Sequence, residues 1–262
     1  MLYRLLDHPA VTASDLTSLR TIQYGAAPIS PERLAAALAI FGPCFIQLYA
    51  QTEVPNFATT LSKRDHARGA DTPELLLSCG RSVMMAEVSI RDDDGASIPT
   101  GEIGEVCVRA PYTMDGYLDD PEAAAERFHG PWLRTGDLGM IDSDGYVFLK
   151  DRRSDMVISG GMNVYTAVVE RVVVEAPGVA QAAVIGVPHP DWGEAVHAVV
   201  TMRAGVVLDE RAVVDFCRER LAAYMRPKSV EAISEMPLTP YGKIDKKRLR
   251  ASRWGDRVRQ IN

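Results

Sequence analysis

The stretch LYAQTE at residues 48–53 places three side chains with different chemistry close together in the sequence. Tyr49 offers an aromatic face that can stack on a base, Thr52 a hydroxyl that can bind a phosphate oxygen, and Glu53 a hard carboxylate suited to a hard cation. On its own, a Thr-Glu pair is more typical of a helix N-terminus. The stretch therefore indicates a nucleotide and metal site only if other segments support it.

Two further segments of the first half could approach the same ligand. Tyr24–Ser30 (YGAAPIS) predicts a strand that runs into a loop at Gly25 and Ala26, where small residues would let a flat ring lie against the backbone. Asp137 follows a glycine in a predicted loop between strands, where a carboxylate can accept hydrogen bonds from ribose hydroxyls. The alternatives are an ordinary strand-to-helix turn and an aspartate in a β-turn.

The second half holds residues that could contact an anionic ligand. Arg152 carries a guanidinium group with paired donors for oxygen atoms. The pair Gly160-Gly161 predicts either a flexible loop that a thin ligand can approach closely or a simple hairpin turn. Two prolines and a glycine within residues 237–246 predict an exposed loop that projects Lys243, which would otherwise be an ordinary solvated lysine.

These residues need a scaffold, and residues 1–150 predict one domain with two parts. The residues SPE at 30–32 are typical of a helix start, the helix should end at Gly42, and residues 45–49 predict a buried strand. Strand, helix, strand is the α/β pattern. From about residue 85 onward, alternating strands and the turns DDDG and DSDG predict a small antiparallel sheet or β-barrel.

The remaining residues, 151–262, predict a compact α+β domain with its own core. Residues 182–187 and 195–202 have the composition of strands. Asp209 should cap a helix that runs past Leu221. The fold class expected for the whole chain is therefore an α/β piece with a small antiparallel β-barrel, followed by a compact α+β domain.

Composition narrows the class of protein. The chain has 262 residues, of which 47% are hydrophobic and 24% charged, as in ordinary globular proteins. A formal net charge of −6 argues against general nucleic-acid binding. No apolar run approaches the ~18 residues of a membrane-spanning helix, and the first residues do not form a signal peptide. We therefore expect a cytoplasmic protein with no membrane span.

The cysteines and one basic cluster carry no chemistry that the sequence alone can assign. The four cysteines form no CxxC pair, so neither a zinc site nor a dithiol redox site is predicted, and each is expected to be buried. The cluster KIDKKRLR at residues 243–250 is either a solvated helix start or a surface for phosphates.

In order and spacing, five segments resemble the core motifs of the adenylate-forming (AMP-binding) superfamily. They are YGAAPIS, LYAQTE, WLRTGDLG, DRRSDMVISGGMNVYTAVVE and PLTPYGKIDK. Gln51, where peptide adenylation domains usually have proline, and the loop GGMNV favour the acyl-CoA synthetase or fatty-acid–CoA ligase type. The chain is similar to the C-terminal half of such an enzyme.

The resemblance implies ATP or AMP, Mg²⁺ and coenzyme A as cofactors, and it assigns roles to the candidates. Thr52 would bind a phosphate oxygen, Glu53 would bind Mg²⁺, and Lys243 would contact both the carboxylate and the α-phosphate in the first half-reaction. Asp151 would be the hinge of the mobile C-terminal domain, which brings in the Gly160-Gly161 loop for thioester formation. The nucleotide contacts implied are Gly25, Ala26, Tyr49, Ala50, Gln51, Asp137 and Arg152.

Some positions depart from the family pattern. Ala50 stands where glycine is usual and could crowd the nucleotide. Thr166 stands where proline is usual and Val168 where glutamate is usual, and at both we expect effects on packing rather than lost chemistry. His189 has no predicted partner, and we do not expect it to act as a base.

The Ser/Thr/Gly-rich loop that cradles the β- and γ-phosphates in this superfamily is not found in the sequence. The chain is thus expected to begin within the large domain, as a fragment, a mis-assigned gene start, half of a split enzyme or a pseudoenzyme. Surface left uncovered could associate with a second copy.

The function implied is an ATP-dependent carboxylate–CoA ligase that acts on a fatty or other organic acid. The alternatives are a non-catalytic nucleotide- or partner-binding remnant and an adenylation domain of another branch of the superfamily. The sequence does not identify the acid.

Overall fold

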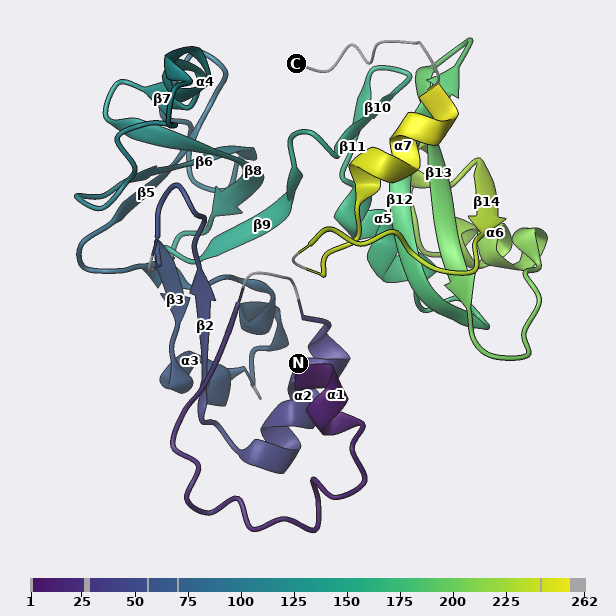
Figure 1. Cartoon of the computed structure of the whole chain (residues 1–262), viewed down its shortest axis with the longest axis horizontal. Coiled ribbons are helices and arrows are strands. Elements are labelled where there is room, and N and C mark those ends of the chain that lie inside the picture. The colour runs from purple at the N-terminus through teal and green to yellow at the C-terminus, as the bar shows by residue number, and fades with distance from the viewer. Residues whose placement is uncertain (1, 26–28, 56, 70, 241, 255–262) are drawn as a thin grey trace. The chain divides into compact units, whose positions relative to one another are not determined.

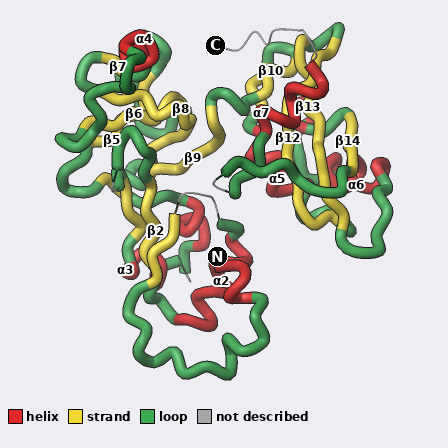
Figure 2. Tube along the Cα trace, viewed as in Figure 1, coloured by secondary structure: helices red, strands yellow, loops and turns green. Residues whose placement is uncertain are grey.

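The computed structural model describes residues 2–25, 29–55, 57–69, 71–240 and 242–254 (Figure 1). Ala26, a predicted nucleotide contact, lies outside these residues. The chain forms two compact units, Met1–Leu149 and Lys150–Asn262. In the described part, strands and loops predominate and helices are few and short (Figure 2), which confirms the expected mixture of α/β and α+β structure.

A mixed sheet opens the first unit, with parallel strands β1 and β2 followed by antiparallel β3 and β4. Helix α2 starts and stops as predicted: Ser30 Oγ accepts a hydrogen bond from Arg33 N at 3.3 Å, and Gly42 takes a φ of 71° beyond the last turn. The strand predicted at residues 45–49 is confirmed. The elements are α1 (Leu2–Leu6), β1 (Ile22–Gly25), α2 (Pro31–Phe41), β2 (Phe45–Tyr49), β3 (Thr59–Leu61), α3 (Lys63–Arg68), η1 (Pro73–Leu77) and β4 (Arg81–Ser82).

The rest of the first unit is a half-barrel sheet in the order β5-β6-β8-β7, with β9 beside β8. Val106, Val108 and Leu133 are fully buried in its core, and Tyr49 from the first sheet packs into the same cluster. The end of β2 is therefore held against the half-barrel. The elements are β5 (Glu87–Arg91), β6 (Gly104–Arg109), α4 (Pro121–Glu126), β7 (Phe128–His129), β8 (Trp132–Ile141) and β9 (Val147–Arg152).

Strand β8 bulges at the place where a loop was predicted. Asp137 lies within this strand, so the predicted loop is wrong. Gly136 takes a φ of 73°, which favours glycine, and the pairing register between β6 and β8 shifts here. Glu105, which is 3% exposed, accepts hydrogen bonds from Gly136 N at 3.0 Å and from the Arg134 guanidinium at 2.8 and 3.0 Å. A bulge can turn a side chain without ending the strand.

The second unit is a five-stranded sheet in the order β11-β10-β13-β12, with β14 parallel to β13. Helices α5 and α7 both pack against β12, and valines dominate the buried core. The elements are β10 (Val157–Ser159), β11 (Met162–Val164), α5 (Thr166–Val173), β12 (Val179–His189), β13 (Gly193–Met202), α6 (Glu210–Arg218), η2 (Ala223–Met225), β14 (Ser229–Ala232) and α7 (Lys246–Trp254).

One boundary in this unit differs from the prediction. Asp209 caps α6 by accepting a hydrogen bond from Ala212 N at 3.1 Å, as expected. The helix ends at Arg218 and does not run past Leu221. Leu221 is buried in the core from the turn that follows, with its N–H bonded to Cys217 O at 2.9 Å. An apolar residue that continues the hydrophobic spacing of a helix can thus be buried in the core although the helix has already ended.

Three of the four cysteines are buried. Cys79, Cys107 and Cys217 are buried free thiols, as predicted, whereas Cys44 is only half-buried. Within the described ranges, no helix has the length and apolar character needed to cross a bilayer. The same residues contain no cluster of three or more His, Cys, Asp or Glu side chains that could hold a metal ion.

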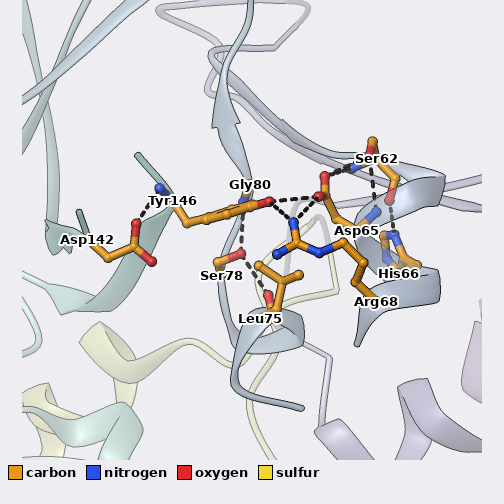
Figure 3. Close-up of polar contacts among 9 residues, drawn as sticks. All are labelled: Ser62, Asp65, His66, Arg68, Leu75, Ser78, Gly80, Asp142 and Tyr146. Atoms are coloured by element: carbon orange, nitrogen blue, oxygen red, sulfur yellow. Dashed lines mark hydrogen bonds and ion pairs between the residues drawn. The ribbon is translucent and has the colours of Figure 1, made fainter. Parts of the chain in front are cut away.

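Polar contacts join α3 to the turn before β9 (Figure 3). Tyr146 donates a hydrogen bond to Asp65 Oδ1 at 2.7 Å and accepts one from Arg68 at 3.1 Å. Ser62 and Asp65 cap α3 reciprocally. Behind them, His66 is 1% exposed, and its Nδ1 lies 2.8 Å from Ser62 O. Its Nε2 lies 2.9 Å from Tyr24 Oη, so α3 is fastened to β1 through a buried imidazole.

Burial of His66 should make the stability of the chain sensitive to acid. Burial lowers the pKa of His66 by disfavouring the imidazolium, although the Ser62 carbonyl and Asp65 oppose the shift. The unfolded chain therefore takes up the proton more readily. This stabilisation is complete above the ordinary histidine pKa of about 6.5 and is lost as the pH falls below it, with a slope of at most about 1.4 kcal/mol per pH unit.

Urea unfolding between pH 7.5 and 5.5 checks this expectation. His66→Gln should make the fall in unfolding free energy shallower but should not abolish it, because burial also lowers the pKa of His197 in the second unit. His8→Gln, at an exposed position, should leave the slope unchanged. An unaltered slope in His66→Gln would contradict the assignment.

Glu105→Ala should destabilise the half-barrel by about 3 kcal/mol, because it leaves the Arg134 guanidinium and the Gly136 N–H without their shared acceptor. Urea unfolding at pH 7 measures the loss. Glu87→Ala removes a carboxylate that also pairs with an arginine, Arg109, but at the surface. That control should cost no more than about 1 kcal/mol, and equal losses in the two variants would refute the structural role of Glu105.

Candidate active site

The end of β2 meets the bulge of β8 at a buried carboxylate. Asp137, 7% exposed, accepts hydrogen bonds at Oδ2 from Tyr49 Oη at 2.7 Å and from Gln51 Nε2 at 2.8 Å. Gln51 Nε2 also donates to Thr135 O at 2.9 Å, and Thr135 Oγ1 accepts from Asp137 N at 3.1 Å. Three predicted residues, Tyr49, Gln51 and Asp137, are therefore brought together across more than eighty positions of sequence.

The electrostatics of this cluster keep Tyr49 a donor. Burial, with the negative charge of Asp137, raises the pKa of Tyr49 well above its ordinary value, so the hydroxyl stays protonated. Two donors at one oxygen hold the Asp137 side chain in a single orientation. A carboxylate fixed in this way can present acceptor positions to the vicinal hydroxyls of a sugar.

Glu53 lies two residues beyond Gln51 and has partners that the sequence did not indicate. Its Oε1 accepts a hydrogen bond from Tyr117 Oη at 2.8 Å and lies 3.6 Å from Arg127 Nη2. Arg127 Nε in turn donates to Tyr117 Oη at 3.1 Å. Tyr117 and Arg127 were missed because no local pattern marks residues that reach Glu53 from this distance in the sequence.

The donor set around Glu53 is suitable for Mg²⁺ in a nucleotide complex. Magnesium is usually held by one or two carboxylates, with waters and substrate phosphates as the other ligands. The Glu53 side chain is 19% exposed, so part of it faces solvent. A single carboxylate is therefore sufficient if phosphate oxygens complete the coordination of the metal ion. The protein itself places one cationic side chain, Arg127, near this carboxylate.

The turn that carries Thr52 is not the start of a helix. Residues 52–54 form a bend, closed by Val54 N donating to Gln51 O at 3.2 Å. Thr52 is exposed on this bend, and Ala50 is half-buried before it. The helix alternative for the Thr-Glu pair is therefore wrong.

Gly25 allows a close contact between two neighbouring strands. It ends β1 opposite Leu48, and a Cβ at Gly25 would lie 2.2 Å from Leu48 O. A larger residue would therefore push β1 away from β2. The absence of a side chain at Gly25 therefore permits close strand packing, and its contact with a nucleotide stays a prediction.

In the second unit, Asp151 is a half-buried residue near the end of β9. Its Oδ2 accepts hydrogen bonds from Thr166 Oγ1 at 2.9 Å and from Thr166 N, and its Oδ1 accepts one from Arg152 N at 2.8 Å. Arg152 itself is exposed. Thr166 therefore makes polar contacts, although the sequence predicted only an effect on packing.

The pair Gly160-Gly161 forms a tight hairpin turn between β10 and β11, as the simpler alternative predicted. Their φ values of 57° and 79° suit a two-residue turn that favours glycine at both positions. Gly160 N donates to Trp192 O at 2.9 Å, and Trp192 stacks on His189 with ring centres 4.1 Å apart. His189 is thus a packing partner of Trp192 beside this turn.

Lys243 is exposed on a loop that the backbone stiffens. Thr239 N donates to Lys243 O at 2.7 Å, Lys243 N donates to Thr239 Oγ1 at 3.2 Å, and Gly242 takes a φ of 77°. Tyr241 lies outside the described residues. Within the described part of the chain, the Lys243 ammonium donates no hydrogen bond, so it can bind an anion.

The basic cluster at residues 243–250 divides into two sets. Lys246 pairs with Glu170 and Arg250 with Asp155, each at 2.7 Å. Those two cations are used inside the second unit, which neither alternative for the cluster predicted. The exposed members are Lys243, Lys247 and Arg248.

Comparison with known proteins shows which family the chain resembles. Residues 1–118 match the AMP-binding enzyme family, and residues 168–243 match the AMP-binding enzyme C-terminal domain. The medium/long-chain-fatty-acid–CoA ligase FadD8 of Mycobacterium tuberculosis is 44% identical, over 97% of this chain and 45% of the relative. The fatty acid–[acyl-carrier-protein] ligase ScoC of Streptomyces coeruleorubidus is 38% identical, over 100% of this chain and 50% of the relative. The chain spans about half the length of these curated relatives.

Solved structures show the same similarity. The amide bond synthetase McbA from Marinactinospora thermotolerans has a TM-score of 0.86 and 45% identity, covering 96% of this chain and 51% of that chain. ATP-bound MatB from Rhodopseudomonas palustris has a TM-score of 0.87 and 32% identity, covering 98% and 50%. The two family matches span both units, and the relatives are aligned along nearly the whole chain. The chain belongs to the AMP-binding, adenylate-forming enzyme family.

Proposed function

We propose that this chain is the C-terminal half of an ATP-dependent carboxylate–CoA ligase, with residues 1–150 completing its large domain and 151–262 forming its mobile C-terminal domain. The observation that carries the proposal is the buried Asp137 carboxylate, oriented by Tyr49 and Gln51. FadD8 and ScoC, whose names give fatty-acid ligation to CoA and to a carrier protein, support a fatty or other organic acid as substrate. ATP and CoA are available in the cytoplasm, which favours that location for the protein.

Residues of the first unit bind and orient the nucleotide in this proposal. Asp137 accepts hydrogen bonds from the ribose hydroxyls, and the Tyr49 ring lies against adenine. Thr52, exposed on its bend, donates to a phosphate oxygen, and Glu53 holds Mg²⁺. When bound, the metal ion neutralises phosphate charge and favours departure of pyrophosphate. The other nucleotide contacts proposed are Gly25, Ala26, Ala50 and Gln51.

Residues of the second unit supply charge and access at different steps. Lys243 brings its ammonium between the substrate carboxylate and the α-phosphate, which lowers the repulsion between two anions as the carboxylate oxygen attacks phosphorus. Arg152 adds donors to ribose and phosphate oxygens.

A turn of the unit near Asp151 then withdraws Lys243 and brings in Gly160-Gly161, beside which the pantetheine arm of CoA can pass. The CoA sulfur attacks the acyl carbonyl of the adenylate, and AMP leaves as the thioester forms. One small domain thereby serves both half-reactions in turn.

Calorimetric titration of the purified chain with AMP tests the nucleoside site. AMP should bind with a micromolar dissociation constant, and Asp137→Ala should weaken binding at least about tenfold, because a charged acceptor for two hydroxyls is lost. Asp94→Ala, at an exposed turn in the same unit, is the matched control and should bind like the unchanged chain.

Equal AMP affinity in Asp137→Ala would remove the ribose role. A well-folded chain that does not bind AMP would mean either that the site needs the rest of a complete ligase or that the chain is a non-catalytic remnant. Circular dichroism on each variant establishes that the chain is folded before the affinities are compared.

A full-length ligase that contains this chain tests Lys243. Lys243→Ala should slow pyrophosphate release from ATP and acid by about 100-fold or more, because one transition-state cation is lost. Thioester formation from a supplied acyl-adenylate should be nearly unchanged. Lys247→Ala is the control for surface charge, because Lys247 is also exposed and lies four residues after Lys243. A similar loss in both half-reactions would show that Lys243 does not act in adenylation alone.

A further inference from the structure

A continuous polar bridge crosses the interior of the second unit. Thr166 Oγ1 donates to Asp151 Oδ2 at 2.9 Å and accepts from Lys246 Nζ at 2.7 Å. Lys246 Nζ also lies 2.7 Å from Glu170 Oε1, which accepts a hydrogen bond from Val184 N at 2.7 Å. The bridge therefore joins the end of β9, the start of α5, strand β12 and the start of α7.

The side chains of the bridge are mostly buried, so their contacts differ from solvent-exposed ion pairs at a protein surface. Thr166 is fully buried, and the side chains of Lys246 and Glu170 are 14% and 22% exposed. Lys246 pairs directly with Glu170 and is linked to Asp151 through the Thr166 hydroxyl. Removing one member would leave the others with fewer hydrogen bonds inside the protein, so the contacts support one another.

A separate contact ties α7 to the same part of the chain. Arg250 lies four residues after Lys246, on the same face of α7. It pairs with Asp155 at 2.7 Å, and these two side chains are 12% and 17% exposed. One face of α7 is therefore fastened twice to the segment that enters the second unit, once through Thr166 to Asp151 and once directly to Asp155.

The position of Lys246 gives these contacts a consequence for the proposed site. Lys246 is the first residue of α7, three residues after Lys243. The bonds that fix Lys246 also fix where the Lys243 loop leaves the body of the unit. The start of α5 depends on the same bridge, because its N-cap residue, Tyr165, makes no side-chain cap and Asp151 accepts the Thr166 N–H instead.

We propose that Thr166 and Lys246 are positioning residues, which lock Asp151 into the second unit and set the base of the Lys243 loop at the same time. Since Thr166 holds Asp151 inside this unit, Asp151 moves with the unit. This inference rests on the proposed function, in which the second unit turns at its junction with the first. The lock would transmit that rotation directly to Lys243.

Hydrogen exchange with mass spectrometry on the full chain tests the lock without any nucleotide, so a failure to bind AMP would not affect the result. Thr166→Val removes the hydroxyl, keeps the N–H and nearly keeps the volume. It should speed exchange about tenfold in residues 150–155 and also in 242–247, the factor expected for one buried hydrogen bond to a charged group. Strands β12 and β13 should stay protected.

Three further variants sharpen the test. Thr166→Ser keeps the hydroxyl and should restore slow exchange in both segments. Thr201→Val in the same unit removes a hydroxyl that lies 3.5 Å from Gln181 Oε1, a long distance for a hydrogen bond. This control should leave exchange in both segments unchanged. Arg250→Gln, which breaks the second tie, should loosen the same two segments even if Thr166→Val does not fold. A change in one segment only, or an equal change throughout the unit, would overturn the proposal.

Discussion

The buried carboxylate of Glu105 is the constraint on which the proposed nucleoside site depends. Only 3% of this residue is exposed, and its charge is matched by the Arg134 guanidinium and the Gly136 N–H. A carboxylate left unpaired at this depth would cost several kcal/mol, so the pairing and the bulge of β8 stabilise each other. The bulge turns Asp137 toward Tyr49 and Gln51. The geometry around Asp137 is therefore a consequence of how one charge is satisfied in the half-barrel.

The second unit also holds a buried charge that needs partners, but this charge is positive. Lys246 is largely buried, and its ammonium is satisfied by Thr166 and Glu170. A buried ion pair adds little net stability on its own, but it requires particular partners in particular places. In this unit the requirement fixes the beginnings of two helices and the point at which the chain enters. The two units thus use buried charge for geometric definition, while valine-rich packing provides the hydrophobic core.

Rigid and free groups are distributed between the units in a way that suits a two-step reaction. Asp137 is held by two donors inside the first unit, and the proposed function has it bind the nucleoside throughout the reaction. Lys243 is exposed on a stiff loop of the second unit. In the proposed mechanism Lys243 is needed in one half-reaction alone, and a mobile domain could then move it away. The chain spans about half the length of these relatives.

Local sequence determined the features that depend on neighbouring residues. The cap at Ser30, the stop at Gly42, strand β2 and the cap at Asp209 follow from side chains within a few positions, because capping and hydrophobic alternation are short-range effects. The order of the motifs likewise pointed to the family. Only tertiary structure decided the rest: the bulge at Asp137 depends on Glu105 from another strand, Glu53 meets Tyr117 and Arg127, and Thr166 joins Asp151 to Lys246. These contacts link residues far apart in the chain, and their energy comes from satisfying buried charge, which no local pattern records.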